Sequence, residues 1–233
     1  IAEKGDACAI AAVAARLGRS DSGVRLDAVD ALRQIADRGN EVAVAALAAR
    51  LEDESCSVRR AAVDTLPLIA EKGDERVITA LAARLEHHDS RVRYAAVNAL
   101  RQVADKGHEV AIAASAARLE DESCSVRRAA VDALREVANQ GDKFAIAAMA
   151  ARLEDENSAV RRAAVDALPQ IVERVDAGVI AALAARLEDE DSAVRRASAD
   201  VLPQMGEGVF AAVAARFGHH DSGVRRAAFY AFH

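Results

Sequence analysis

The side chains of this chain whose spacing most favours chemistry are arginines. A Val-Arg pair occurs seven times, at intervals of 34 residues except for the last interval, which is 30. A guanidinium group presents five N–H donors in a rigid fork that fits carboxylates and phosphates. Acidic turns accompany these pairs and the formal net charge is −6, so we expect no binding of nucleic acid, which requires uncompensated cations. The series is Arg25, Arg59, Arg93, Arg127, Arg161, Arg195 and Arg225.

Histidines and cysteines offer two further kinds of chemistry. His87-His88 and His219-His220 replace acidic residues in two turns four periods apart, too distant to share a metal ion, and adjacent histidines alone are a weak ligand pattern. Cys56 and Cys124 stand where other copies have Ser, and two periods of stacked helices separate them by about 20 Å, beyond disulfide reach. We therefore expect no metal site, and free thiols that favour a reducing, intracellular compartment.

Catalytic patterns do not occur in the sequence. It has no nucleophile paired with a base, no paired carboxylates in an apolar setting and no Gly-rich phosphate loop. The many Asp and Glu residues recur in register on turns, and recurrence in every unit indicates structure, because a catalytic site needs one special location. We predict a protein that is not an enzyme, with no cofactor and no small-molecule substrate.

The fixed period indicates stacked structural repeats. The residue three positions before each Val is Asp, Ser or Asn, a good N-cap, so a first helix begins there in all seven copies. Apolar residues follow at helical spacing, for example Val58, Ala61, Ala62, Thr65 or Leu66, and Ile69. The N-caps are Asp21, Ser55, Asp89, Ser123, Asn157, Asp191 and Asp221.

A column of glycines marks the end of the first helix. Gly39, Gly73, Gly107 and Gly141 are typical of the left-handed residue just past a helix. Asn40, Asp74, His108 and Asp142 follow, and all but His108 are strong N-caps for a second helix of about 12 residues, for example Asp74 to Leu85. Each unit is thus predicted to be helix, tight turn, helix and an acidic turn.

Two irregularities modify the repeats. Pro67, Pro169 and Pro203 share one column inside the first helix, where each removes a backbone donor, and we expect a bend there. The 30-residue interval lacks four residues between Leu202 and Gly208, about one helical turn, so the first helix shortens while its phase is nearly kept.

Composition fits an array better than a compact domain. The 233 residues are 52% hydrophobic but only 3% aromatic, and small side chains suit closely spaced helices. Charged residues interrupt every apolar run well before the roughly 18 residues of a membrane span, so we expect a soluble protein that does not insert into a membrane. Because both ends interrupt a repeat and no polar cap is evident, we expect an excerpt of a longer array.

We predict one array over residues 1–233. It comprises a partial repeat 1–17, the repeats 21–54, 55–88, 89–122, 123–156, 157–190 and 191–220, and a partial repeat 221–233.

The pattern D/S-x-x-V-R-R-A-A-V-D-A-L, followed by an Ala/Leu-rich second helix, resembles HEAT repeats, most closely the short HEAT-like class of phycobilin lyases. The resemblance implies an all-α, right-handed α-α superhelix. It also implies that the seven arginines form a structural ladder, each reaching an acidic or carbonyl group of an adjacent unit. Tetratricopeptide repeats share the period but need large aromatic residues, and this chain has no Trp and two Tyr.

The function implied by the resemblance is a non-catalytic scaffold or adaptor that binds one or more protein partners along an extended surface. One alternative is a phycobilin lyase-like or light-harvesting assembly factor. A second is a deoxyhypusine hydroxylase-like enzyme, suggested by His108-Glu109 and opposed by the lack of further His-Glu dyads. A third is an engineered consensus array, opposed by the free cysteines and the 30-residue unit.

Specificity is expected where the copies differ. The second helices are almost uniformly Ala along two columns, which begin at Ala14 and Ala15, and one of these faces is expected to be exposed. Variation concentrates in one column near the start of the second helix, where we place the candidate partner contacts. They are Cys8, Val42, Arg76, Val110 and Phe144, with Gly178 in the same column.

Overall fold

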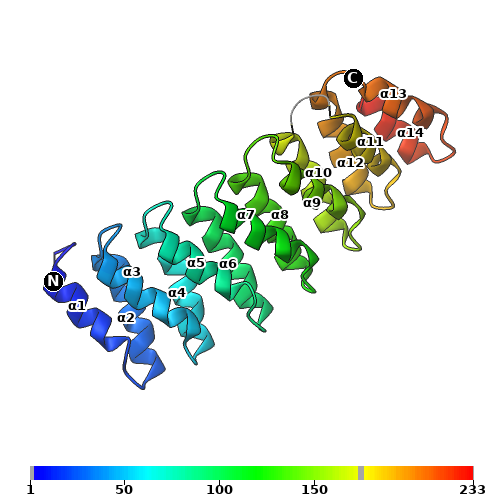
Figure 1. The fold of residues 1–233 in the computed structure, drawn as a ribbon. Coiled ribbons are helices and arrows are strands. Elements are labelled where there is room, and N and C mark those ends of the chain that lie inside the picture. Colours follow the sequence, from blue (N-terminus) through cyan, green and yellow to red (C-terminus); the bar gives the residue numbers. More distant parts are fainter. Residues whose placement is uncertain (1–2, 173–175, 233) are drawn as a thin grey trace. The chain divides into compact units, whose positions relative to one another are not determined.

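The computed structural model describes residues 3–172 and 176–232, and over these ranges the regular structure is entirely helical (Figure 1). The helices form two compact units, residues 1–114 and 115–233, and the boundary falls inside helix α7 (Glu109–Ala117). In each unit first helices pack on first helices and second helices on second helices, so consecutive helix pairs stack as a HEAT-like solenoid.

The first unit holds three first helices and the second helices that alternate with them. Its elements are α1 (Ala7–Arg16), α2 (Ser22–Ile35), α3 (Glu41–Ala48), the 3-10 helix η1 (Ala49–Glu52), α4 (Cys56–Ile69), α5 (Glu75–Arg84), α6 (Ser90–Val103) and the start of α7.

The second unit continues the same alternation, with a 3-10 turn after each second helix. Its elements after α7 are η2 (Arg118–Glu120), α8 (Cys124–Val137), α9 (Lys143–Ala151), η3 (Arg152–Glu154), α10 (Ser158–Ile171), α11 (Ala177–Ala185), η4 (Arg186–Glu188), α12 (Ser192–Val201), η5 (Leu202–Met205), α13 (Val209–Ala214), η6 (Ala215–Gly218) and α14 (Ser222–Tyr230).

All seven predicted N-caps of the first helices occupy the cap position. The Asp and Asn caps accept backbone hydrogen bonds, as at Asp21, whose Oδ1 lies 3.0 Å from the N of Val24. The expectation was wrong for Ser55 and Ser123, whose side chains make no cap hydrogen bond.

The second helices begin and end close to the predicted residues. Helix α5 runs from Glu75 to Arg84 between the caps Asp74 and Leu85. His108, expected to be the weak cap, accepts a hydrogen bond from the N of Ala111 at its Nδ1 over 3.4 Å. The imidazole of His108 therefore takes part of the role that Asp has in the other copies.

The glycine column is left-handed, as predicted, with φ angles of 79° to 85° at Gly39, Gly73, Gly107 and Gly141. Its predicted place at the helix end was wrong, because α2 ends at Ile35 and Gly39 lies in the turn beyond it. The reason is a contact between neighbouring repeats. The N of Gly39 donates to the carbonyl of Ile69 over 2.7 Å, and a Cβ on Gly39 would stand 2.6 Å from the carboxylate of Glu71.

The core between the rows of helices is aliphatic. In α4 the side chains of Val58, Leu66 and Ile69 are buried, and α4 packs against α3, where Leu47 is buried as well. Ala61, predicted on this face, is only partly buried. The buried side chains of this helix are thus aliphatic, as the composition indicated.

The irregular unit has the predicted shorter first helix. Helix α12 has 10 residues, whereas α10 has 14, and Pro203 lies in the 3-10 segment η5 rather than inside an α-helix. Pro67 and Pro169 lie inside α4 and α10, two residues before each helix ends. Each proline leaves the carbonyl four residues earlier, that of Val63 or Val165, without its helical donor, and the helix continues for two more residues.

Candidate functional site

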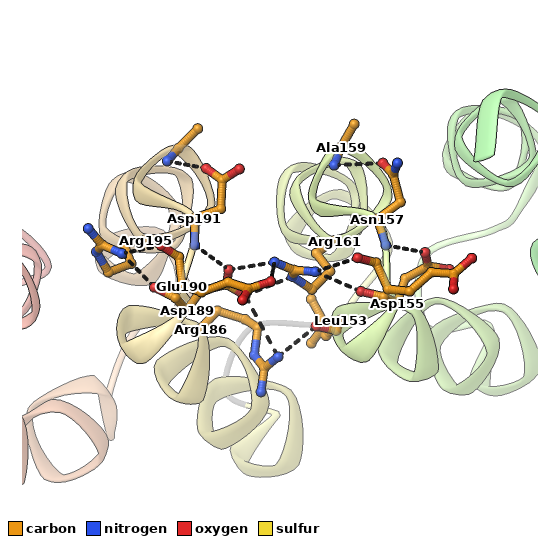
Figure 2. Close-up of polar contacts among 12 residues, drawn as sticks. Leu153, Asp155, Asn157, Ala159, Arg161, Arg186, Asp189, Glu190, Asp191 and Arg195 are labelled. Atoms are coloured by element: carbon orange, nitrogen blue, oxygen red, sulfur yellow. Dashed lines mark hydrogen bonds and ion pairs between the residues drawn. The ribbon is translucent and has the colours of Figure 1, made fainter.

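The turns between units are organised by the arginines of the first helices. Arg161 donates from Nη1 to the carbonyls of Asp155 and Glu156, over 2.8 and 3.2 Å, in the turn before its own helix. Its Nε and Nη2 each lie 2.8 Å from a carboxylate oxygen of Asp189, in the next turn along the chain (Figure 2). Nη2 also donates to Glu190 over 3.3 Å. One guanidinium therefore joins two successive turns.

Arg25 and Arg127 make the same double connection. Arg25 donates to the carbonyls of Arg19 and Ser20 and forms an ion pair with Asp53, from Nη2 to Oδ1, over 2.8 Å. Arg127 pairs with Asp155 over 2.9 Å and with Glu156 over 3.0 Å. The Asp53 side chain is 2% exposed while that of Glu54 is 82% exposed, so in these turns the Asp is structural and the Glu faces solvent.

Where histidine replaces the aspartate, the arginine keeps its hydrogen bonds to the carbonyls of the preceding turn but forms no ion pair with the next turn. Arg59 and Arg195 bind the two carbonyls of the preceding turn, and Arg195 does so over 2.6 and 2.9 Å. The next turn holds His87-His88 or His219-His220, and no described carboxylate pairs with either arginine there. Arg93 and Arg225 likewise bind carbonyls of these histidine pairs.

Histidine reproduces one of the two roles of the aspartate. Asp189 Oδ1 accepts a hydrogen bond from the N of Asp191 over 3.0 Å, and His87 Nδ1 accepts from the N of Asp89 over 2.9 Å. Burial, together with the charges of His88 and Arg59, lowers the pKa of His87 and so favours its neutral form. Burial alone would raise the pKa of Asp53, yet Arg25 and the N–H of Ser55 hold it below its usual range.

A second set of arginines, to which we assigned no role from the sequence, connects neighbouring repeats in the opposite direction along the chain. Arg186 Nη1 donates to the carbonyl of Leu153 over 2.8 Å, one turn back along the chain (Figure 2). Arg50 and Arg152 make the equivalent bond over 2.9 Å. The recurrence of Ala-Ala-Arg-Leu, as regular as that of Val-Arg, was the signal that could have identified this set.

The acidic turns of the second unit line an open groove of about 660 Å³. Six carboxylates and three guanidinium groups surround it. Glu154, Glu156 and Glu190 are the outermost, with side chains 82 to 86% exposed. The lining is Glu154, Asp155, Glu156, Arg161, Ala185, Arg186, Glu188, Asp189, Glu190 and Arg216.

The variable column lies on exposed surface. Val42, Val110 and Phe144 are 53, 46 and 59% exposed, and Cys8 and Arg76 are exposed as well. In the first unit Arg76 lines a groove of about 510 Å³ between α3 and α5, whose floor includes Ala48, Ala80 and Ala83. The Ala15 column is mostly exposed and the Ala14 column is mostly half-buried. Sequence variation therefore concentrates on a solvent-facing part of the second helices.

The other candidates do not assemble into a reactive centre in the part of the chain that the structure describes. Cys56 and Cys124 are exposed free thiols at the start of α4 and α8. His108 Nε2 lies 3.0 Å from a carboxylate oxygen of Glu75. Within residues 3–172 and 176–232 no three His, Cys, Asp or Glu side chains are grouped as metal ligands, and no helix has the length and hydropathy of a membrane span.

Comparison with protein-family models matches HEAT repeats to residues 44–114, 112–202 and 150–232. Comparison with curated proteins finds no match.

Solved structures share the fold at low sequence identity. A designed armadillo repeat protein in complex with the peptide (KR)4 is 20% identical over 96% of this chain and 98% of its own, with a TM-score of 0.53. The Escherichia coli protein YibA is 17% identical over 98% and 82%, with a TM-score of 0.64. An engineered protein is 21% identical over 95% and 67%, with a TM-score of 0.57.

Proposed function

Because the chain belongs to the HEAT-repeat family, whose solenoid fold is typical of protein-interaction scaffolds, we propose that it is a non-catalytic adaptor that binds a basic segment of a partner protein. The segment is extended and rich in Lys and Arg, and it lies along the acidic turns. The partner contacts expected at Val42, Arg76, Val110 and Phe144, and at Cys8, belong to the same proposal. The phycobilin-lyase alternative stays a prediction.

The observation that carries this proposal is the charge balance of the 660 Å³ groove. Its lining holds six carboxylates and three guanidinium groups, a formal charge of −3. Arg127 and Arg161 pair with the buried Asp155 and Asp189 and also touch Glu156 and Glu190, but these two glutamate side chains are 84 and 86% exposed and remain open to a ligand. Such an arrangement attracts a cationic chain and raises its association rate.

The geometry favours an extended ligand. Equivalent glutamates recur once per turn, as Glu156 and Glu190 do one period of 34 residues apart, so successive positive side chains of one segment meet successive carboxylates. The designed armadillo repeat protein of similar fold is itself in complex with an alternating Lys-Arg peptide. Small exposed residues on the second helices let a backbone approach closely.

Non-catalytic action is part of the proposal. The polar groups of the turns repeat in register and pair with one another, whereas a reactive centre requires one distinct location with a perturbed group. The electrostatic groove needs no cofactor to bind a cationic segment.

The test is a titration of the purified chain with a fluorescent (KR)4 peptide, followed by anisotropy at low and high salt. We expect saturable binding that weakens as salt rises, because the contacts are between exposed charges. The double variant Glu156→Gln and Glu190→Gln keeps one oxygen acceptor at each position and loses two charges, and we expect its affinity to fall about tenfold.

Glu207→Gln is the matched control, since Glu207 is exposed in the second unit outside the groove lining. Phe144→Ala tests the contact column separately and is expected to weaken binding by a smaller factor. Absence of binding at low salt, or equal losses in the double variant and the Glu207→Gln control, would contradict the proposal.

A further inference from the structure

A second groove, of opposite charge, lies between the first helices α12 and α14. Its volume is about 470 Å³, and its lining contains three arginines and one carboxylate, that of Asp200. The formal charge of the lining is +2, in a chain whose net charge is −6. The lining residues are Ser192, Arg195, Arg196, Ala199, Asp200, Gly223, Arg226, Ala227 and Tyr230.

The cations of this groove have no carboxylate partner within ion-pair distance among the described residues. Arg195 uses Nη1 to bind the carbonyls of Asp189 and Glu190 (Figure 2), and its other edge is the one that binds an aspartate in the equivalent position of Arg161. His219 occupies that aspartate position here. The Nε and Nη2 of Arg195 are therefore available to a ligand.

The second change removes a carboxylate from the facing helix. In four other copies an Asp stands four residues after the second Arg of the pair, as Asp166 does after Arg162, and these two side chains lie 3.8 Å apart. In α14 the corresponding residue is Tyr230, which is 60% exposed, so Arg226 has no such partner.

The third change opens the groove beside Arg195. Position 223 is Gly, where the equivalent residues 125 and 159 are Ser and Ala. A Cβ on Gly223 would stand 3.2 Å from Nη2 and 3.6 Å from Nε of Arg195. The nearby carboxylate of Asp221 is engaged in capping α14, where it accepts from the N atoms of Gly223 and Val224 over 2.6 and 3.2 Å.

From these three substitutions we propose that the groove between α12 and α14 binds a phosphate monoester. Arg195, Arg196 and Arg226 supply guanidinium donors to the phosphate oxygens, and Ser192 and Tyr230 supply hydroxyl groups at the rim. A dianionic phosphate balances the +2 of the lining, which a singly charged carboxylate does not. The group belongs either to a small phosphorylated molecule or to a phosphorylated side chain of a protein segment.

The test uses inorganic phosphate, a phosphoserine peptide and its unphosphorylated form as probes, followed by the NMR signals of the Gly223 amide and the arginine Nε–H groups. We expect saturable shifts with phosphate. We also expect Arg226→Gln and Arg196→Gln each to weaken binding about tenfold, and Arg162→Gln, the matched residue one groove away, to leave it unchanged. Phosphopeptide affinity well above that of phosphate assigns the source to a protein segment, and equal affinities assign it to a small molecule.

His219→Asp is the reciprocal variant. It restores the carboxylate for Arg195, so phosphate binding is expected to be lost while the urea midpoint rises. The proposal is overturned if phosphate gives no saturable shift, if acetate binds as tightly, if Arg162→Gln and Arg226→Gln weaken binding equally, or if a single-stranded oligonucleotide binds more tightly than the phosphopeptide.

Discussion

Two turns of the second unit differ at each of three positions and differ in how they hold their neighbours. In the acidic turn, Glu188-Asp189-Glu190, the carboxylate of Asp189 binds both the N–H of Asp191 and the fork of Arg161. In the histidine turn, Gly218-His219-His220, His219 binds the N–H of Asp221 over 3.1 Å and makes no ion pair with Arg195. The local shape of a turn and the link between successive helices are thus separable properties.

The largest effect is expected on removing the aspartate. Asp189→Ala leaves Arg161, whose side chain is 6% exposed, with the exposed Glu190 in place of its buried carboxylate, and breaking a buried pair costs about 3–5 kcal/mol. His219→Ala removes a turn acceptor and a 3.9 Å contact of Nε2 with Glu188, and we expect a loss of about 1 kcal/mol. Urea unfolding and amide hydrogen exchange in α10 and α12 measure both. Equal losses in the two variants would show that the ion pair adds nothing to the turn.

A smaller effect is expected at the glycine turn that joins the first and second helices of one repeat. The N of Gly141, with a φ of 80°, donates to the carbonyl of Ile171 over 2.7 Å, so Gly141→Ala forces a side chain into the left-handed region. We expect a loss of about 1–2 kcal/mol by urea unfolding. The control is Gly218→Ala, where a Cβ meets nothing within 4 Å. A larger loss of unfolding free energy in Gly141→Ala than in Asp189→Ala would show that the glycine turn holds neighbouring repeats together more strongly than the acidic turn does.

The smallest effect is the response of the two kinds of turn to pH, which we follow in the first unit. The lowered pKa of His87 means that its contribution is complete above the unfolded value of about 6.5 and is lost as pH falls through the folded pKa. The lowered pKa of Asp53 delays the corresponding loss until the pH is below about 4.

Urea midpoints measured between pH 7.5 and pH 4.5 check this difference. We expect His87→Asp to abolish the part of the decline that begins near pH 6.5, because an aspartate there remains charged and pairs with Arg59. An unchanged pH profile in His87→Asp would assign the decline to other groups.

The fold could be predicted from the sequence because each repeat carries the same pattern of caps and apolar residues. The cap at Asp21, the helix from Glu75 to Arg84 and the ten-residue α12 all follow from local chemistry and register. The predicted place of Gly39 at a helix end was wrong because its N–H binds the carbonyl of Ile69 in the next repeat. A rule based on neighbouring residues in the sequence does not include that distant acceptor.

The candidate sites were harder to predict for the same reason. The recurrence of Ala-Ala-Arg-Leu marks Arg186 as structural, but its acceptor is the backbone carbonyl of Leu153, a group that every residue type carries and that the sequence therefore does not single out. The groove between α12 and α14 needs His219, Gly223 and Tyr230 at one place, and each is unremarkable alone. Only the packing of α14 against α12 brings their separate substitutions together.

The double connection of Arg161 also bears on how such a gene changes in length. Every 34-residue segment that contains this arginine and its aspartate carries both halves of the contact. An in-frame duplication or deletion of one such segment therefore rejoins a matched donor and acceptor at the new boundary. A segment that ends in a histidine pair carries the arginine without its aspartate. Each duplication of such a segment would add a boundary between repeats that lacks this ion pair.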